Sequence, residues 1–81
     1  MPRPRGSPEP VQIGALLAGY RRKRGLSQET LAGRAGLDRT YIGMIERGER
    51  SPTLLAVWSI LDALDVDWAE FGARLDAIER T

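Results

Sequence analysis

Three glycines divide the middle of the chain into short segments. Gly25, Gly36 and Gly48 are 11 and 12 residues apart, which leaves about two helical turns between successive glycines. Glycine readily adopts the left-handed conformation that ends many helices, and an apolar residue after it can close the last turn. Leucine follows both Gly25 and Gly36. The spacing therefore predicts short helices in series.

Apolar residues repeat at helical spacing on both sides of these glycines. Ile13, Leu16, Leu17 and Tyr20 share one face of a helix that begins near Val11. Four residues of types that commonly cap helices precede the later segments, and they are Ser27, Asp38, Thr53 and Asp67. No segment alternates as a strand does. We therefore predict an all-α fold of five helices.

The first ten residues, MPRPRGSPEP, have a different composition. They contain four of the five prolines and no apolar periodicity, which predicts a flexible arm over residues 1–10. The helical domain is then expected to span residues 11–81. Arg3 and Arg5 in the arm are candidates for contacts with a phosphate backbone, although a flexible arm without such a role is the simpler reading.

Composition excludes several functions. A chain of 81 residues is one small domain at most. It contains neither Cys nor His, so disulfides, zinc hydrolysis and Ser/His/Asp or Cys/His catalysis are excluded, and no metal or cofactor is implied. No group of residues supplies an acid, a base and a nucleophile, so we do not expect an enzyme. Without a membrane span or a secretory signal, a cytoplasmic location is expected.

Charge is distributed unevenly along the chain. Residues 1–50 hold ten basic and five acidic side chains, whereas residues 51–81 hold two and six. The net charges of the two parts are therefore +5 and −4, within a total of +1. Such a separation suggests a polyanion as the partner of the basic part, although ordinary solvated surface has the same appearance.

Two of the expected helices form a helix-turn-helix unit over residues 27–47. In such a unit the second helix enters the major groove of DNA and the first crosses the phosphate backbone. Base contacts are predicted on the exposed face of the second helix, at Arg39, Thr40, Gly43 and Met44. Arg39 can bind guanine O6 and N7, and Thr40 can bond a base or contact the thymine methyl. Gly43 would let the helix sit deep, or is merely tolerated, and Met44 can instead pack at the core edge.

Phosphate contacts are predicted around this helix. The candidates are Ser27, Gln28, Tyr41, Arg47, Arg50 and Ser51. At the start of the first helix, backbone amides and the helix dipole favour a phosphate oxygen. The Gln28 amide is placed to donate to phosphate and to brace Arg39 at the same time.

Residues 13–66 resemble the lambda-repressor and Cro type of helix-turn-helix regulator. The residues that carry the resemblance are Arg21, Gly25-Leu26-Ser27-Gln28, Leu31-Ala32, Ala35-Gly36, Ile42, Ile45-Glu46, Gly48, Pro52-Thr53-Leu54 and Leu64. The resemblance implies a five-helix DNA-binding domain, usually dimeric on a near-palindromic operator, that regulates transcription. It implies that Gln28, Arg39, Thr40 and Gly43 face the DNA, and that Arg21 pairs with Glu46.

The chain departs from that pattern at Asp65, where glycine is common, and at Gly43, where a polar contact residue is frequent. The run LDRTYIGMIERGERSPT and the short length are similar to controller proteins of restriction-modification systems. These are small dimeric regulators that time endonuclease expression.

A dimer interface is predicted on the last two helices, over residues 53–64 and 68–79. The earlier of them is apolar on more than one side, and a small monomer cannot bury the second side. The later helix, over residues 68–79, has apolar residues at successive intervals of 3, 4 and 3 positions, as in helices that pack knobs into holes. The predicted interface residues are Trp58, Trp68, Phe71, Leu75 and Ile78. The alternative is that the last helix only folds back onto its own core.

The sequence thus predicts a sequence-specific regulator of transcription that binds double-stranded DNA as a homodimer, with no small-molecule ligand evident. A controller protein of a restriction-modification system is the narrower hypothesis. An antitoxin or a prophage-type repressor that also binds a protein partner is the alternative.

Overall fold

The computed structural model describes residues 6–79 as a bundle of five α-helices, with no strand in that range. The helices are α1 (Pro10–Lys23), α2 (Gln28–Ala35), α3 (Arg39–Glu46), α4 (Leu54–Leu64) and α5 (Trp68–Glu79). The predicted all-α, five-helix fold is confirmed. Arg3 and Arg5 of the predicted arm lie outside the described residues.

Short polar side chains set where four of the helices begin. The predicted caps Ser27, Asp38, Thr53 and Asp67 each accept a backbone N–H from the first turn of their own helix. The donors are Thr30, Thr40, Ala56 and Glu70, at 2.8–3.0 Å. Each bond satisfies one of the N–H groups that a helix start leaves without an internal partner.

Left-handed residues end the helices as the glycine spacing predicts. The φ angles of Gly25, Gly36 and Gly48 are +67°, +68° and +76°. Asp65 ends α4 in the same conformation, with φ +57°. An Asp side chain tolerates this region better than most residues do. The chain therefore turns sharply after every one of the first four helices.

The boundary of the N-terminal arm was predicted one residue too late. Pro10 is the first residue of α1, because proline has a suitable φ and its missing N–H would be unpaired at this position anyway. The backbone N–H of Glu9 donates to Oε1 of Gln12 at 2.8 Å. This bond gives the preceding residue a defined place at the helix start.

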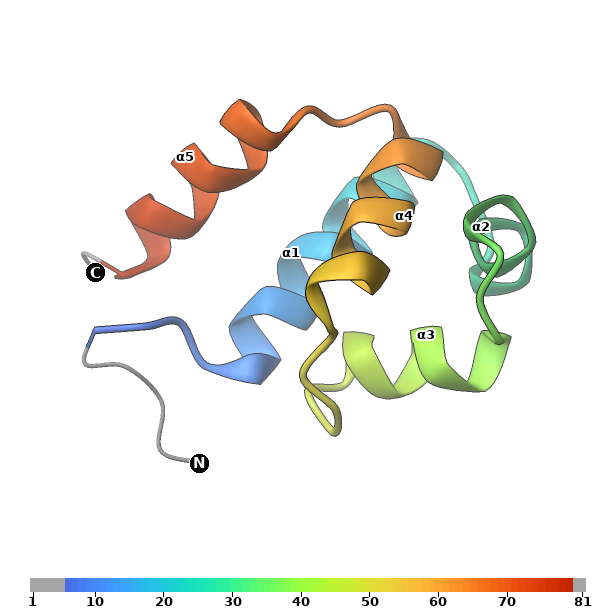
Figure 1. The fold of residues 1–81 in the computed structure, drawn as a ribbon, viewed down its shortest axis with the longest axis horizontal. Helices are drawn as coiled ribbons and strands as arrows, with labels where there is room; N and C mark the ends of the chain where they lie inside the picture. The colour runs from blue at the N-terminus through green and yellow to red at the C-terminus, as the bar shows by residue number, and fades with distance from the viewer. Residues whose placement is uncertain (1–5, 80–81) are drawn as a thin grey trace.

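The core lies where the first four helices meet. α1 packs against α3, α2 packs against both α3 and α4, and α5 lies against α1. The most deeply buried large side chains are Leu17, Leu31, Ile42, Ile45, Ile60, Leu61 and Leu64. Figure 1 shows α3 along one edge of the bundle and α5 on the opposite side. One long face of α3 is therefore left uncovered by other helices.

Close approach of two backbones fixes α3 on α1. A β-carbon at Gly14 would collide with the carbonyl oxygen of Ile45 and lie 2.9 Å from that of Glu46. Only glycine fits there. The C-terminal end of α3 is therefore held directly against the backbone of α1.

Candidate nucleic-acid interface

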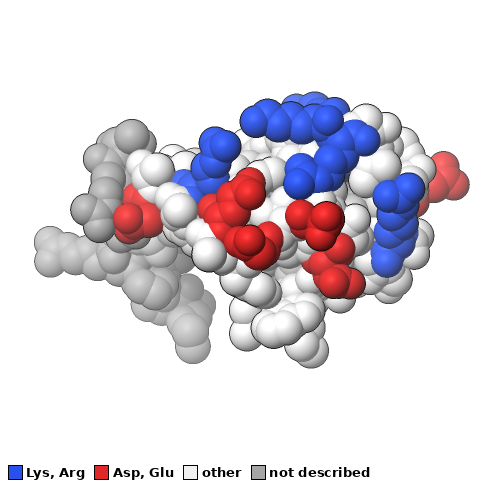
Figure 2. Space-filling view, turned by 90° about the horizontal axis from the view of Figure 1, so that it is seen from above, with Lys and Arg blue, Asp and Glu red and all other residues white. Residues whose placement is uncertain are grey.

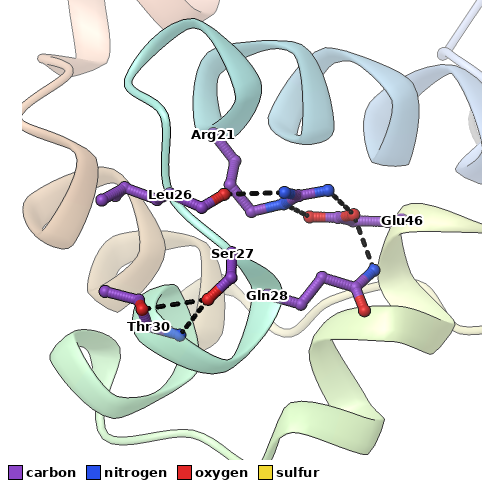
Figure 3. A network of polar contacts seen from close by, with 6 residues as sticks. All are labelled: Arg21, Leu26, Ser27, Gln28, Thr30 and Glu46. Atoms are coloured by element: carbon purple, nitrogen blue, oxygen red, sulfur yellow. Dashed lines mark hydrogen bonds and ion pairs between the residues drawn. The ribbon is translucent and has the colours of Figure 1, made fainter.

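A buried ion pair joins the first helix to the end of the third. Nε of Arg21 donates to Oε2 of Glu46 at 2.7 Å, and Nη2 donates to Oε1 at 2.9 Å. Nη1 of the same guanidinium donates to the carbonyl of Leu26 at 2.8 Å. Gln28 adds a bond from Nε2 to Oε1 of Glu46 at 2.9 Å (Figure 3). One carboxylate thus ties together α1, α2 and α3.

Both members of the pair are charged near neutral pH. Their side chains are only 11% and 7% exposed. Burial by itself would raise the pKa of Glu46, but hydrogen bonds from Arg21 and Gln28 and the positive charges of Arg21 and Arg22 outweigh it and lower that pKa. The hydrogen bond to Glu46 raises the pKa of Arg21. A two-bond pair of this kind fixes orientation as well as distance.

The amide of Gln28 does not brace Arg39, which corrects the expectation from the sequence. Its NH₂ group donates to Glu46 instead. Arg39 has only donors, so bracing it would use the amide oxygen of Gln28, and within residues 6–79 no hydrogen bond joins these two side chains. Gln28 is therefore part of the scaffold that holds α3, and its predicted phosphate contact stays a prediction.

The start of α3 presents two polar side chains to solvent. Arg39 and Thr40 are exposed in its first turn, whereas Ile42 and Ile45 are buried against the bundle. Met44 is half-buried at the edge of the core. The helix is therefore anchored along one side, and its other side offers a guanidinium and a hydroxyl.

Gly43 is buried, contrary to the exposed position predicted for it. The side chain of Arg47 covers it, because a β-carbon at Gly43 would lie 3.0 Å from Nη1 of that arginine. The same guanidinium pairs with Glu49, from Nε to Oε2 at 2.7 Å and from Nη2 to Oε1 at 3.2 Å. The side chains of this pair are more than half exposed. Arg47 thus lies along α3 itself.

The remaining predicted phosphate contacts lie at the two ends of the unit. Half-buried Tyr41 accepts the backbone N–H of Thr53 at 3.3 Å, and the guanidinium of Arg50 lies 5.9 Å from its ring centroid. Ser51 follows on the exposed surface. Ser27, at the other end, donates its hydroxyl proton to Oγ1 of Thr30 at 2.9 Å.

Comparison with known proteins gives the family of this arrangement. The model of the helix-turn-helix family HTH_3 matches residues 17–71. The chain belongs to this helix-turn-helix family. The family consists of DNA-binding regulators of transcription, which are not a class of enzymes. The fold class and the resemblance to helix-turn-helix regulators that were inferred from the sequence are confirmed.

Individual relatives of this helix-turn-helix protein are regulators too. The restriction-modification controller protein C.AhdI of Aeromonas hydrophila has 44% identity and a TM-score of 0.74, over 76% of this chain and 94% of its own. The controller protein C.Esp1396I, solved as a tetramer with its natural 35-base-pair operator, has 30% identity and a TM-score of 0.81, over 89% and 95%. The HTH-type transcriptional regulator y4dJ of Sinorhizobium fredii is 36% identical over 64 residues, 79% of this chain and 83% of the relative.

The predicted dimer surface contains an aromatic patch and one residue that belongs to the core. Trp58 and Trp68 are 58% and 38% exposed, with ring centroids 5.4 Å apart. Phe71 is only 3% exposed, so its side chain is buried within its own chain rather than available to a partner. Leu75 and Ile78 are half-buried. The last helix therefore packs onto the core with one side. Trp58 of α4 and Trp68 of α5 form an exposed aromatic patch beside it.

Two exposed leucines extend this patch and were absent from the predicted set. Leu54 and Leu55 are 69% and 77% exposed in the first turn of α4. A groove of about 340 Å³ lies beside them, lined mainly by Ile13, Pro52, Leu54, Val57, Trp68, Phe71 and Leu75. The surplus of apolar residues in this helix was the sequence signal, but which of them face outward depends on how α4 is rotated.

Charge is mixed on the side of the molecule away from α3. Figure 2 views the bundle from above Figure 1 and shows Lys and Arg intermingled with Asp and Glu on that face. The acidic C-terminal part of the sequence therefore does not form a separate acidic region on this face.

The described residues, 6–79, contain no group of His, Cys, Asp and Glu side chains that could hold a metal ion. None of the helices in this range has the length and hydrophobicity of a membrane span.

Proposed function

We propose that this protein is a homodimeric, sequence-specific regulator of transcription that acts as the controller of a restriction-modification system. The observation that carries the proposal is the presentation of Arg39 and Thr40. They are exposed in the first turn of a helix whose other end is held by a buried, bidentate ion pair. Rigid presentation of such side chains is what base reading in the major groove requires.

The narrower assignment is supported by relatives of matching size. C.AhdI is matched over 94% of its length and C.Esp1396I over 95%. Both are described as restriction-modification controller proteins, and the second was solved with operator DNA. A regulator of this kind acts on DNA, so we expect it in the cytoplasm.

The apolar groove supports dimerisation. Its lining and the exposed rim residues Leu54, Leu55 and Trp58 form a continuous apolar surface on a small domain, and such surfaces commonly mark protein interfaces. Arg39 and Thr40 are not among the residues that line the groove. A second copy seated here would leave both copies of α3 free for DNA, which is the arrangement that two half-sites need.

Selection from a pool of random duplexes tests the proposal. The expected product is a two-fold symmetric site whose half-sites lie about one helical turn, ~10 base pairs, apart. A duplex that carries the selected site is expected to be shifted in a gel. Recovery of no preferred sequence would contradict the proposed function.

A further inference from the structure

The side chain of Arg47 places a guanidinium where α3 lacks a side chain of its own. Arg39, Gly43 and Arg47 follow one another at intervals of four residues, so they lie on one face of the helix. Side chains of a helix point back toward its N-terminus. Nη1 of Arg47 accordingly lies 3.0 Å from the position a β-carbon of Gly43 would take. The result is a second guanidinium one turn beyond Arg39.

Glu49 holds this guanidinium by one edge only. Its carboxylate accepts from Nε at 2.7 Å and from Nη2 at 3.2 Å. Nη1 is the nitrogen nearest to Gly43 and is not bonded to this carboxylate. An arginine has five N–H donors in a rigid fork, so a carboxylate on one edge leaves donors on the other.

The backbone around the pair is set by the end of α3. Gly48 adopts a left-handed φ of +76°, and its N–H donates to the carbonyl of Ile45 at 3.0 Å. The N–H of Glu49 then donates to the carbonyl of Met44 at 2.9 Å. These bonds return the chain over the last turn of the helix. The backbone of Glu49 therefore has a defined position, which places its carboxylate beside Arg47.

We propose that Arg47 reads a guanine in the major groove, one turn beyond the base pair contacted by Arg39, and that Glu49 is the residue that positions it. The free edge of the guanidinium would bind O6 and N7 of that guanine, while the carboxylate restricts its rotation. This inference rests on the proposed function. It replaces the phosphate contact expected for Arg47 from the sequence.

Base-by-base binding profiles test the proposal. The duplex selected by the wild-type protein is varied one base pair at a time, and affinities are measured for wild type, Arg47→Ala and Glu49→Gln. Both variants are expected to lose about tenfold discrimination at the same single position. The double variant should lose no more than Arg47→Ala alone. Arg39→Ala should flatten a different position. Gly43→Ala, whose β-carbon would displace the guanidinium, should act as Glu49→Gln does.

Asp62→Asn is the matched control, because it removes one exposed carboxylate from α4 and is expected to leave every position unchanged. Equal weakening on all duplexes by Arg47→Ala would make this residue a phosphate contact. Uniformly tighter binding by Glu49→Gln would mean that its carboxylate only repels DNA. Either result overturns the proposal, whereas a wild-type protein without any preferred site would overturn the proposed function itself.

Discussion

At the scale of single residues, Glu46 connects more of the molecule than its place at the end of α3 suggests. It accepts hydrogen bonds from Arg21 on α1 and Gln28 on α2. The sequence offered many other acidic and basic residues as partners, and periodicity alone did not select between them. The pairing came from the family resemblance, and the structure adds Gln28 as the third member.

Removing the carboxylate is expected to destabilise the fold strongly. Glu46→Ala leaves the guanidinium of Arg21 buried without its counter-ion, which costs about 3 kcal/mol. Thermal unfolding should show a fall in Tm of roughly 10 °C or more for a domain of this size. Glu49→Ala breaks a solvent-exposed pair of the same chemistry and is the control, with little change in Tm expected. Equal effects of the two substitutions would contradict the role of burial.

Acid should weaken the protein through the same carboxylate. The pKa of Glu46 is lower in the folded protein than its ordinary value of 4.5. Its contribution is therefore complete above pH about 4.5 and is lost as the pH falls through the lowered folded-state pKa. Denaturant titrations of wild type and Glu46→Gln across this range should converge in stability as the pH drops. A stability difference between the two proteins that stays constant as the pH falls would exclude Glu46 as the source of the acid sensitivity.

Base reading by Arg39 has a characteristic signature. Arg39→Ala should cost about 1–3 kcal/mol of binding free energy and relax preference at one base pair. Arg50→Ala should instead weaken binding to all sequences and reduce the salt dependence by about one counter-ion. Affinities for the selected duplex and its single-base variants, measured at several salt concentrations, separate the two. Uniform weakening by Arg39→Ala would refute base reading there.

At the scale of helices, close packing of α1 against α3 decides the position of the reading helix. Gly14 and Gly19 are both within α1 and look alike in the sequence. In the structure a β-carbon at Gly14 meets the backbone of α3, whereas one at Gly19 meets no atom within 4 Å. Only the first of the two glycines is required by packing.

This difference gives a matched pair of substitutions. Gly14→Ala should destabilise the fold by about 1–3 kcal/mol because the backbones must separate. Gly19→Ala should stabilise it by up to about 1 kcal/mol, since alanine favours helix more than glycine does. Chemical denaturation of the two variants measures both changes. Stabilisation by Gly14→Ala would mean that α3 can shift without cost.

At the scale of the whole molecule, the exposed apolar surface is the feature that a single copy leaves unexplained. Both tryptophans of the chain lie at this surface, and their rings are in contact with each other. Phe71 belongs to the chain's own core, and Leu75 and Ile78 of the same helix are half-buried. The surface proposed for the partner is therefore the first turn of α4 together with the aromatic patch of Trp58 and Trp68.

Leu54→Asp is expected to yield monomers in sedimentation experiments, because it buries a charge in the proposed interface. Tryptophan emission should shift to longer wavelength in the same variant, and in wild type on dilution. Val11→Asp changes another exposed apolar residue, one outside the groove lining, and should leave the mass unchanged. An unaltered dimer in Leu54→Asp would remove α4 from the interface.

Local chemistry determined the five helices of residues 6–79 and most of the points at which they begin and end. Glycine and Asp65 permit left-handed turns, and Ser, Asp and Thr side chains bond the helix starts in any context, so residues close in the sequence sufficed. Tertiary packing decided the rest. It buried Phe71, exposed Leu54, directed Gln28 to Glu46 and placed Arg47 over Gly43. These outcomes depend on helix rotation and on contacts between residues distant along the chain, which spacing alone does not specify.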